Sequence, residues 1–233
     1  MGLLQVSTLT KRYGHLTALS EVSFSIQSGE VLGLIGPNGS GKTTLFECLG
    51  GVLPADEGSV SENGRALTPD ERKARVFYLP DAIAPWPAQT VRWALDFIVG
   101  FFGGIGVGRD EVVRQLALDP LLDSPIGTLS KGQRKRALLA IGLLTPQPIL
   151  LADEPFDGLD LRQTRDVAQT LRSHARTGRT MFLSIHQIND AARVCDRFVL
   201  LSNGRVRGEG TLEELSMKAD GRRDLEEVFL ALT

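Results

Sequence analysis

The segment from Gly36 to Thr43 constrains the fold more than any other part of the chain, because it fits the pattern Gly-x-x-x-x-Gly-Lys-Ser/Thr. The residues before it, Val31 to Ile35, are almost all apolar, as in a strand buried on both faces. The residues after it, Lys42 to Leu49, have the composition of a helix. A strand, a glycine-rich turn and a helix in this order form an anion-binding loop, since backbone N–H groups and the positive helix end face one point. The sequence therefore predicts a phosphate-binding loop.

Each position of this phosphate loop, residues 36–43, has an expected role. Lys42 should reach the β and γ phosphates, and the Thr43 hydroxyl should bind Mg²⁺. Glycines are needed where the backbone adopts a positive φ or lies against the phosphates. A surface turn with a helix cap is the alternative, but the complete pattern with both flanks in place argues against it. The predicted nucleotide-binding residues of this segment are Gly36, Pro37, Asn38, Gly39, Ser40, Gly41, Lys42, Thr43 and Thr44.

Apolar runs elsewhere in the chain predict further strands. Val22, Phe24 and Ile26 alternate with polar residues, which is the period of a half-exposed strand. Apolar runs without alternation follow at 76–79, 149–152, 180–185 and 198–201, and a helical pattern covers 161–175. Strands that alternate with helices are typical of a largely parallel sheet covered by helices. The predicted fold class is therefore α/β.

Between about residues 88 and 144 the strand signals stop, and helical patterns replace them at 91–99, 109–118 and 131–144. We interpret this region as a helical subdomain inserted into the nucleotide-binding core. Proline-rich segments at 85–87 and 145–148 mark its exits, because a residue before proline is pushed out of the helical region. The length of 233 residues leaves room for one large domain. We expect a single domain over residues 1–233 with a helical tail at about 211–233.

Two adjacent carboxylates end one of the predicted strands. Asp153 and Glu154 follow the apolar run at 149–152, and Pro155 prevents the strand from continuing. Ligands bind at the carboxyl ends of parallel strands, so both acids should emerge beside the bound phosphates. We expect Asp153 to hold Mg²⁺ and Glu154 to polarise the water that attacks the γ phosphate. Two solvated acids are the plainer interpretation, and the upstream phosphate loop argues against it.

Charge and cysteine usage exclude several classes of protein. Lys plus Arg number 26 against 28 Asp plus Glu, a net charge of -2, so no positive field gathers nucleic acid. Cys48 and Cys195 lack partner spacing, which suits reduced thiols in the cytosol rather than disulfides or a zinc site. The first ten residues lack a signal-peptide pattern, and glycines interrupt the apolar stretch 97–107. We expect membrane contact only through a partner.

The segment from Leu129 to Gln133 precedes a predicted helix, and by composition Ser130 simply caps that helix. Together with the phosphate loop and the acidic strand end, however, it resembles the signature sequence of the ATP-binding cassette (ABC) family. The resemblance covers about residues 3–215. It implies a P-loop NTPase fold with a mostly parallel core sheet, a small antiparallel β subdomain and an inserted helical subdomain. It also implies that Ser130 and Gly132 are ligands of an ATP γ phosphate and that Gln133 is a further nucleotide-binding residue.

Three further positions resemble functional residues of that family. Tyr13 resembles the aromatic residue that stacks on adenine, and Asp160 lies in a loop like the one that touches the partner subunit. His186 resembles the switch histidine that contacts the γ phosphate. The resemblance thus implies Lys42, Glu154 and His186 as catalytic residues, and ATP and Mg²⁺ as cofactors. It further implies a head-to-tail dimer, in which the signature of one subunit faces the phosphate loop of another.

Two positions depart from the family pattern. Asp81 follows Tyr-Leu-Pro, where the family usually has glutamine, and Lys131 stands where the signature often has glycine. A carboxylate repels the γ phosphate unless a metal lies between them. We therefore hypothesise that Asp81 binds Mg²⁺ through water and leaves hydrolysis slow but present. Thr43, Asp153 and Asp81 are the expected metal ligands.

Three functions follow from the resemblance. The first is an ATP-hydrolysing subunit of an ABC transporter, which pairs with a second ABC subunit as a homodimer or heterodimer and drives a transmembrane permease from the cytoplasmic face. The tail at 224–233 resembles the chain ends of drug and lipid exporter cassettes, which favours export. The second is a soluble ABC ATPase of repair, translation or cluster assembly. The third is a regulatory nucleotide-binding module with negligible hydrolysis, which Asp81 alone supports.

Overall fold

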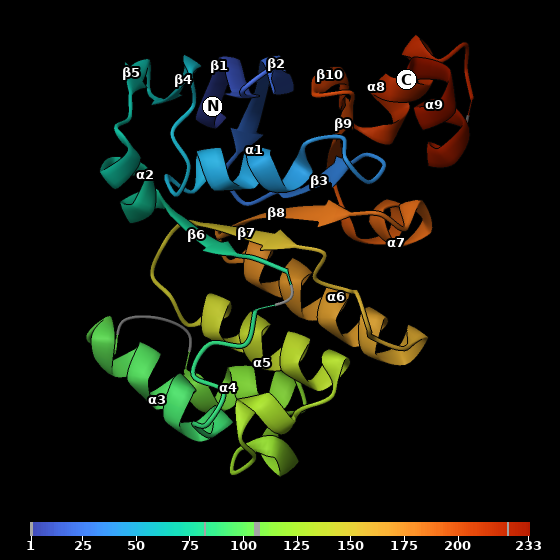
Figure 1. Cartoon of the computed structure of the whole chain (residues 1–233). Coiled ribbons are helices and arrows are strands. Elements are labelled where there is room, and N and C mark those ends of the chain that lie inside the picture. Colours follow the sequence, from blue (N-terminus) through green and yellow to red (C-terminus); the bar gives the residue numbers. More distant parts are fainter. Residues whose placement is uncertain (1, 82, 105–107, 223) are drawn as a thin grey trace.

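The structure, a computed structural model, describes residues 2–81, 83–104, 108–222 and 224–233 (Figure 1). A central sheet has the strand order β10-β9-β3-β8-β7-β6, and every neighbouring pair in it except β10 with β9 is parallel. Its strands are β3 (Val31–Ile35), β6 (Val76–Leu79), β7 (Ile149–Asp153), β8 (Thr180–Ile185), β9 (Arg197–Ser202) and β10 (Arg205–Gly210). The mostly parallel sheet predicted from the apolar runs is confirmed.

A smaller antiparallel sheet has the strand order β2-β1-β4-β5. It consists of β1 (Gly2–Tyr13), β2 (Leu16–Gln27), β4 (Glu57–Glu62) and β5 (Arg65–Ala66). Helix α1 (Lys42–Leu49) lies between the two sheets, and the antiparallel sheet lies beyond it at the top of the view (Figure 1). The antiparallel subdomain implied by the family resemblance is therefore present.

Helices α6 (Leu161–Arg176) and α5 (Lys131–Leu143) lie on the opposite side of the central sheet from α1, and α3 (Val91–Phe101) and α4 (Arg109–Gln115) lie beyond them (Figure 1). The inserted helical subdomain is thus present in the fold. Short 3₁₀ turns at Asp119–Leu121 and Ile126–Thr128 join α4 to α5. The remaining helices are α2 (Pro69–Arg75), α7 (Ile188–Val194), α8 (Leu212–Lys218) and α9 (Leu225–Leu232).

The central strands divide the apolar interior into two cores, because successive side chains point to opposite faces of a sheet. In β3, Leu32 and Leu34 pack into the core that contains α1, whereas Val31 and Ile35 pack into the core that contains α5 and α6. This two-sided burial explains why β3 has no polar alternation. The chain leaves β3 at Ile35, where the phosphate loop begins.

The helix predicted at 109–118 was too long. Helix α4 ends at Gln115, because Ala117 has a φ of 49°, a left-handed conformation that a helix cannot continue through. The predicted single domain over residues 1–233 and the bounds 88–144 and 211–233 for its subregions stay predictions.

Cys48 and Cys195 are both buried and unpaired. Burial raises the pKa of the Cys48 thiol to about 11, so this thiol stays protonated near neutral pH. Within the described ranges, no helix is both long and apolar enough to cross a bilayer.

A triad of aromatic rings joins the two sheets through α1. The Phe182 ring on β8 lies 4.9 Å from the Phe46 ring on α1 and 5.5 Å from the Phe24 ring on β2, measured between centroids. All three side chains are buried. Phe182 therefore connects the central sheet, the helix behind the phosphate loop and the antiparallel sheet.

Replacement of this central ring should destabilise the whole domain. We expect Phe182→Ala to lower the free energy of unfolding by about 3–5 kcal/mol, because it leaves a cavity among the three elements. Urea unfolding followed by circular dichroism measures the change. Leu230→Ala on α9, where the side chain is 68% exposed, serves as the control and should have little effect. Equal effects of the two substitutions would contradict the role assigned to Phe182.

Candidate functional site

The phosphate loop connects β3 to α1 and requires glycine at two points for different reasons. Gly41, immediately before α1, has a φ of 104°, which other residues rarely adopt. Gly36 lies so close to its neighbours that an added Cβ would be 2.3 Å from the Leu201 carbonyl oxygen. The loop is thus held tightly against β9, with its backbone turned toward the edge of the central sheet.

A cavity of about 610 Å³ opens over the phosphate loop. This volume falls within the range of about 300–1,000 Å³ that is typical of small-molecule sites. Its walls come from the loop, from the first two strands and from the ends of β6 and β7. The predicted site residues that line it are Tyr13, Pro37, Asn38, Gly39, Gly41, Lys42, Thr43, Thr44, Asp81, Asp153 and Glu154.

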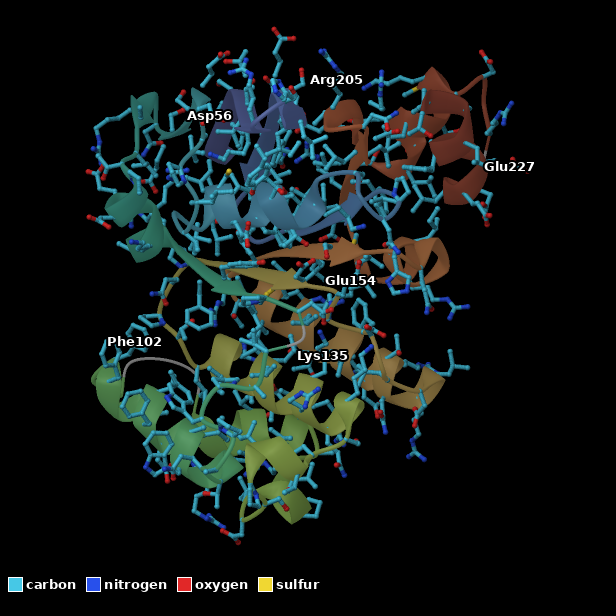
Figure 2. The ribbon with its side chains drawn as sticks, viewed as in Figure 1. Asp56, Phe102, Lys135, Glu154, Arg205 and Glu227 are labelled. Carbon is cyan, nitrogen blue, oxygen red and sulfur yellow. The ribbon has the colours of Figure 1, made fainter. Side chains whose placement is uncertain are left out.

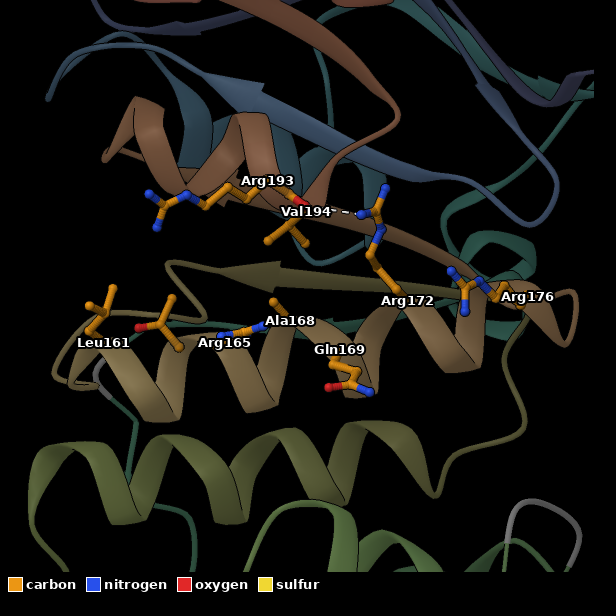
Figure 3. Close-up of a pocket in the computed structure, with 9 residues that line it drawn as sticks. Leu161, Arg165, Ala168, Gln169, Arg172, Arg176, Arg193 and Val194 are labelled. Carbon is orange, nitrogen blue, oxygen red and sulfur yellow. Dashed lines mark hydrogen bonds between the residues drawn. The ribbon is translucent and has the colours of Figure 1, made fainter.

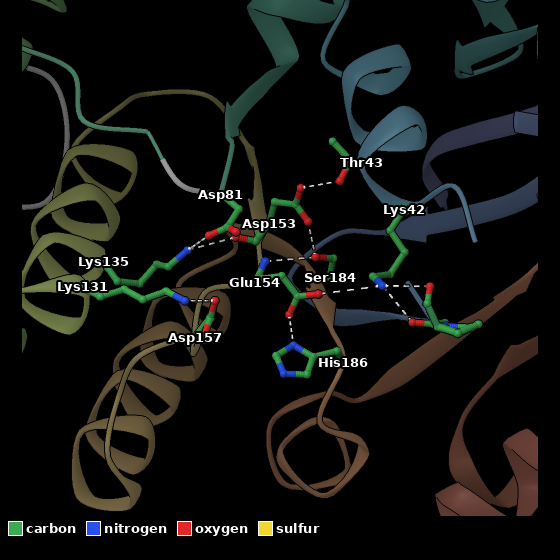
Figure 4. Close-up of polar contacts among 12 residues, drawn as sticks. Lys42, Thr43, Asp81, Lys131, Lys135, Asp153, Glu154, Asp157, Ser184 and His186 are labelled. Carbon is green, nitrogen blue, oxygen red and sulfur yellow. Dashed lines mark hydrogen bonds and ion pairs between the residues drawn. The ribbon is translucent and has the colours of Figure 1, made fainter. Parts of the chain in front are cut away.

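Lys42 is buried at the base of this cavity. Its Nζ donates to the Gly36 carbonyl at 2.8 Å and to the Pro37 carbonyl at 3.4 Å, and it lies 3.8 Å from Glu154 Oε1 (Figure 4). The ammonium group is therefore surrounded by oxygen atoms of its own loop and by one carboxylate. This arrangement holds a positive charge where the loop can present it to a phosphate.

Asp153 at the end of β7 links the phosphate loop to the neighbouring strand. Thr43 Oγ1 donates to Asp153 Oδ2 at 2.9 Å, and Ser184 Oγ on β8 donates to the other carboxylate oxygen. The same Ser184 hydroxyl accepts a hydrogen bond from the Glu154 backbone N–H at 3.0 Å. Ser184 thereby orients both acidic residues. The prediction from sequence missed Ser184, although a serine inside an apolar run is a signal that a buried polar group has a partner.

Glu154 leaves the strand in an unusual backbone conformation. Its φ is 50°, in the left-handed region that non-glycine residues seldom occupy. Such strain is concentrated at functional sites. The side chain lies between Lys42 and His186, and His186 Nδ1 is 2.5 Å from Glu154 Oε2. Glu154 thus has one oxygen oriented by a cation and the other by an imidazole.

Asp81 does not face the cavity as an uncompensated charge. Its Oδ1 forms an ion pair with Lys135 Nζ at 2.6 Å, and the same ammonium group donates to the Asp153 backbone carbonyl at 3.4 Å (Figure 4). Lys135 is a residue of α5 and is buried, with its side chain 5% exposed. Figure 2 labels Lys135 and Glu154 where the helical insertion meets the central sheet. A cation of the helical insertion thus balances the carboxylate that replaces the family's usual glutamine.

Lys135 was missed by sequence reasoning, and no local signal identifies it. It is one of several basic residues in the first turns of α5, which read together as a solvated face. Only the fold brings this particular lysine to Asp81, which lies far away in the sequence.

The signature residues take up a position apart from the cavity. Ser130 caps α5 by accepting a hydrogen bond from the Gln133 backbone N–H, and the Gln133 side chain accepts in return from the Ser130 N–H. The helix-cap role expected from composition is confirmed. Asp160 caps α6 in a similar way, because its Oδ1 accepts a hydrogen bond from the Gln163 backbone N–H at 2.8 Å. The described residues that line the cavity over the phosphate loop do not include residues 130–133, Asp160 or His186.

The signature turn packs against the loop that precedes α6. An added Cβ on Gly132 would be 2.5 Å from the Gly158 carbonyl oxygen, so this approach requires glycine. Lys131, the second departure from the family pattern, forms an ion pair with Asp157 at 2.5 Å. Its charge is therefore balanced within the same chain.

Comparison with known proteins agrees with this geometry. The sequence profile of the family described as ABC transporter matches residues 19–157. The chain belongs to the ABC transporter family. The Nod factor export ATP-binding protein I of Ralstonia nicotianae is 33% identical to it over 91% of this chain and 68% of that protein. The SkfA peptide export ATP-binding protein SkfE of Bacillus subtilis is 28% identical over 97% of this chain and 96% of that protein.

A solved structure of the ATP-binding subunit of an ABC transporter superposes on this ABC subunit with a TM-score of 0.88, at 29% identity and 99% coverage of both chains. Members of the ABC family bind adenine nucleotides and hydrolyse ATP. The chain is therefore an ATP-hydrolysing subunit of the ABC transporter type, and subunits of this type dimerise and work with transmembrane partners.

Loss of the Asp81 carboxylate should destabilise the protein through Lys135. We expect Asp81→Ala to lower the free energy of unfolding by about 1–3 kcal/mol, because it leaves a buried ammonium group without its counter-ion. The effect is smaller than for a fully buried pair, since the Asp81 side chain is 35% exposed. Urea unfolding measures it.

The matched control for this pair is the double variant Asp81→Ala with Lys135→Met, which removes both charges. It should recover most of the lost stability, because no unpaired charge remains in the interior. If the double variant instead loses as much free energy of unfolding as Asp81→Ala and Lys135→Met lose in sum, the ion pair has no part in stability.

Proposed function

We propose that two cassettes, either two copies of this chain or this chain and a related subunit, close around two ATP molecules. In each site the phosphate loop of one subunit and Ser130, Gly132 and Gln133 of the other hold the same nucleotide. The observation that carries this proposal is the position of the signature turn, which lies outside the cavity over its own phosphate loop. Ser130 is exposed at the start of α5, so its side chain is accessible to a neighbouring subunit.

The residues around the cavity have distinct proposed roles. Lys42 binds the β and γ phosphates, and Glu154 accepts a proton from the attacking water. His186 contacts the γ phosphate and keeps the Glu154 carboxylate in place, a role that its 2.5 Å contact with Glu154 supports. Asp160 contacts the partner subunit. Tyr13, whose side chain is 46% exposed at the cavity wall, stacks on adenine.

The site suits Mg²⁺ that is held partly by nucleotide phosphates. Thr43 and Asp153 present a hydroxyl and a carboxylate only 2.9 Å apart, and Mg²⁺ prefers such oxygen ligands together with phosphate and water. In the described part of the chain, no group of three or more His, Cys, Asp or Glu residues forms a metal site of its own. Thr43 and Asp153 are therefore the proposed ligands, with Asp81 acting through water. The bound ion would neutralise charge on the phosphates.

An exposed aromatic surface on the helical insertion is the proposed contact with the transmembrane partner. The Trp93 and Phe97 rings stack with their centroids 5.1 Å apart, and the Phe101 ring extends this stack beyond Phe97. The Trp86 ring packs edge-on against both Trp93 and Phe97. These four side chains are 37–70% exposed. Large exposed apolar patches mark interaction sites. Binding here would bring the subunit to the cytoplasmic face of a membrane through its partner.

Export is the direction that the relatives support, since two of them are export ATP-binding proteins by name. The transport function, rather than a soluble role in repair, translation or cluster assembly, agrees with these names. A regulatory module without hydrolysis is disfavoured by Glu154 and His186, which are in contact beside the phosphate loop.

Removal of the proposed base should trap the ATP-bound dimer. We expect Glu154→Gln to bind ATP, to lose most of its ATPase activity and to elute as a dimer on gel filtration with ATP and Mg²⁺. The amide keeps the shape of the carboxylate but cannot accept the proton from water. Hydrolysis at the parental rate would disprove the assignment of Glu154 as the base.

A companion variant separates binding from chemistry. Lys42→Ala removes the phosphate-binding ammonium group, so it should lose nucleotide affinity and stay monomeric in the same gel-filtration buffer. Unchanged ATP binding in this variant would contradict the role of the phosphate loop.

The aromatic surface can be tested with the permease bound. We expect Trp93→Ser with Phe97→Ser to keep ATP binding but to lose the transmembrane protein that co-purifies with the parent from detergent extracts. The loss follows from the removal of the apolar contact area. Leu230→Ser, which changes an exposed apolar residue on α9, is the control. Equal recovery of the permease with both variants would exclude this surface as the docking site.

A further inference from the structure

Another cavity lies between α6 and α7, and none of the predicted nucleotide-site residues lines it (Figure 3). It has a volume of about 630 Å³, which is again in the range of small-molecule sites. Helix α6 supplies one wall, and the end of α7 supplies the other. The lining residues are Leu161, Thr164, Arg165, Ala168, Gln169, Arg172, Arg176, Arg193 and Val194.

The charge of this cavity is strongly one-sided. Arginine occupies four of the lining positions, and none of the lining residues whose side chains the structure describes is acidic. Arg172 is balanced by Asp196 at 3.3 Å and also donates to the Arg193 backbone carbonyl at 3.1 Å. For Arg165, Arg176 and Arg193, the described side chains provide no carboxylate within ion-pair distance. The whole chain has a net charge of -2, so this concentration of cations is local.

Helical spacing accounts for the arrangement. Arg165, Arg172 and Arg176 lie seven and four residues apart, which places them along one side of α6. The adjacent side of the helix buries Val167 and Leu171 in the core, so α6 cannot turn to move the arginines away from α7. The short side chain of Ala168 in the middle of the row leaves the space that the cavity occupies.

We propose that this cavity binds a small organic phosphate with at least two negative charges. Guanidinium groups bind phosphate oxygens through paired hydrogen bonds, and several of them together favour a multiply charged ligand. Leu161, Ala168 and Val194 provide an apolar wall for the organic part of the ligand. The phosphate comes either from a soluble ester or from a lipid headgroup, since both have the same chemistry at this site.

The location suggests what the bound ligand does. Helix α6 starts directly after Asp160, and α7 starts shortly after His186. An anion that bridges the arginines of both helices holds together two elements that begin at proposed site residues. Binding of the anion to the arginines does not depend on the proposed function. Only its effect on the nucleotide site rests on that function.

The test uses fructose 1,6-bisphosphate as a soluble probe and phosphatidylcholine vesicles with or without phosphatidic acid as a lipid probe. The protein is first saturated with ADP and Mg²⁺, so that the phosphate loop is occupied. Calorimetry measures binding of the bisphosphate, and co-sedimentation measures binding to vesicles. We expect the variant with Arg165→Gln, Arg176→Gln and Arg193→Gln to bind the effective probe at least about tenfold more weakly.

A second triple variant, Arg205→Gln with Arg207→Gln and Arg222→Gln, is the matched control, because it removes three exposed arginines elsewhere on the surface. It should bind as the parent does, and both triple variants should keep the parental ATPase activity. Binding of the bisphosphate assigns the site to a soluble ester, and binding of phosphatidic acid vesicles alone assigns it to a lipid headgroup.

Three results would overturn the proposal. The first is that the parent binds neither probe. The second is that the two triple variants bind equally well, which would show that general surface charge accounts for binding. The third is that the probe still binds to the variant without the cavity arginines but no longer binds to Lys42→Ala, which would place the probe at the phosphate loop.

Discussion

The hydrogen bonds around Asp153 are the constraint on which the rest of the site depends. This one residue accepts from Thr43 at the start of α1 and from Ser184 on the neighbouring strand, and its backbone carbonyl accepts from Lys135 of the helical insertion. Asp153 can hold these three elements together because β7 lies inside a parallel sheet, where strand ends converge. Displacement of any one element would therefore alter the position of the other two and of Glu154, which directly follows.

Local sequence patterns were sufficient where the chemistry requires particular residues at short spacing. The phosphate loop and the acidic strand end are of this kind, since a left-handed Gly41 and a strand-ending Pro155 have few substitutes. Strand β1 was not predicted, because a left-handed Thr8 interrupts its alternation. Helix α2 was missed although it begins with a capping box at Thr68–Glu71, which is a signal present in the sequence. Helix α8 begins with another capping box at Thr211–Glu214 and lies within the stretch predicted as a helical tail.

Long-range charge pairing was beyond the reach of sequence reasoning. From the sequence, Asp81 was expected to need a metal between it and the phosphates, and the pattern gave no sign that Lys135 also supplies a counter-ion. The departure from the family's glutamine is thus accompanied by a cation on another element. An acidic residue near bound phosphates becomes tolerable when its charge is already balanced in the folded chain. The charge that Asp81 presents to the cavity therefore depends on the position of α5, which carries Lys135.

The close packing of Gly132 on Gly158, reinforced by the ion pair of Lys131 with Asp157, has a mechanical consequence. It joins the start of α5 to the loop that leads into α6, so these two segments should shift as one rigid block. In the proposed pair of cassettes, both segments face the neighbouring subunit. A displacement of either segment by the neighbouring subunit would therefore displace the other segment as well.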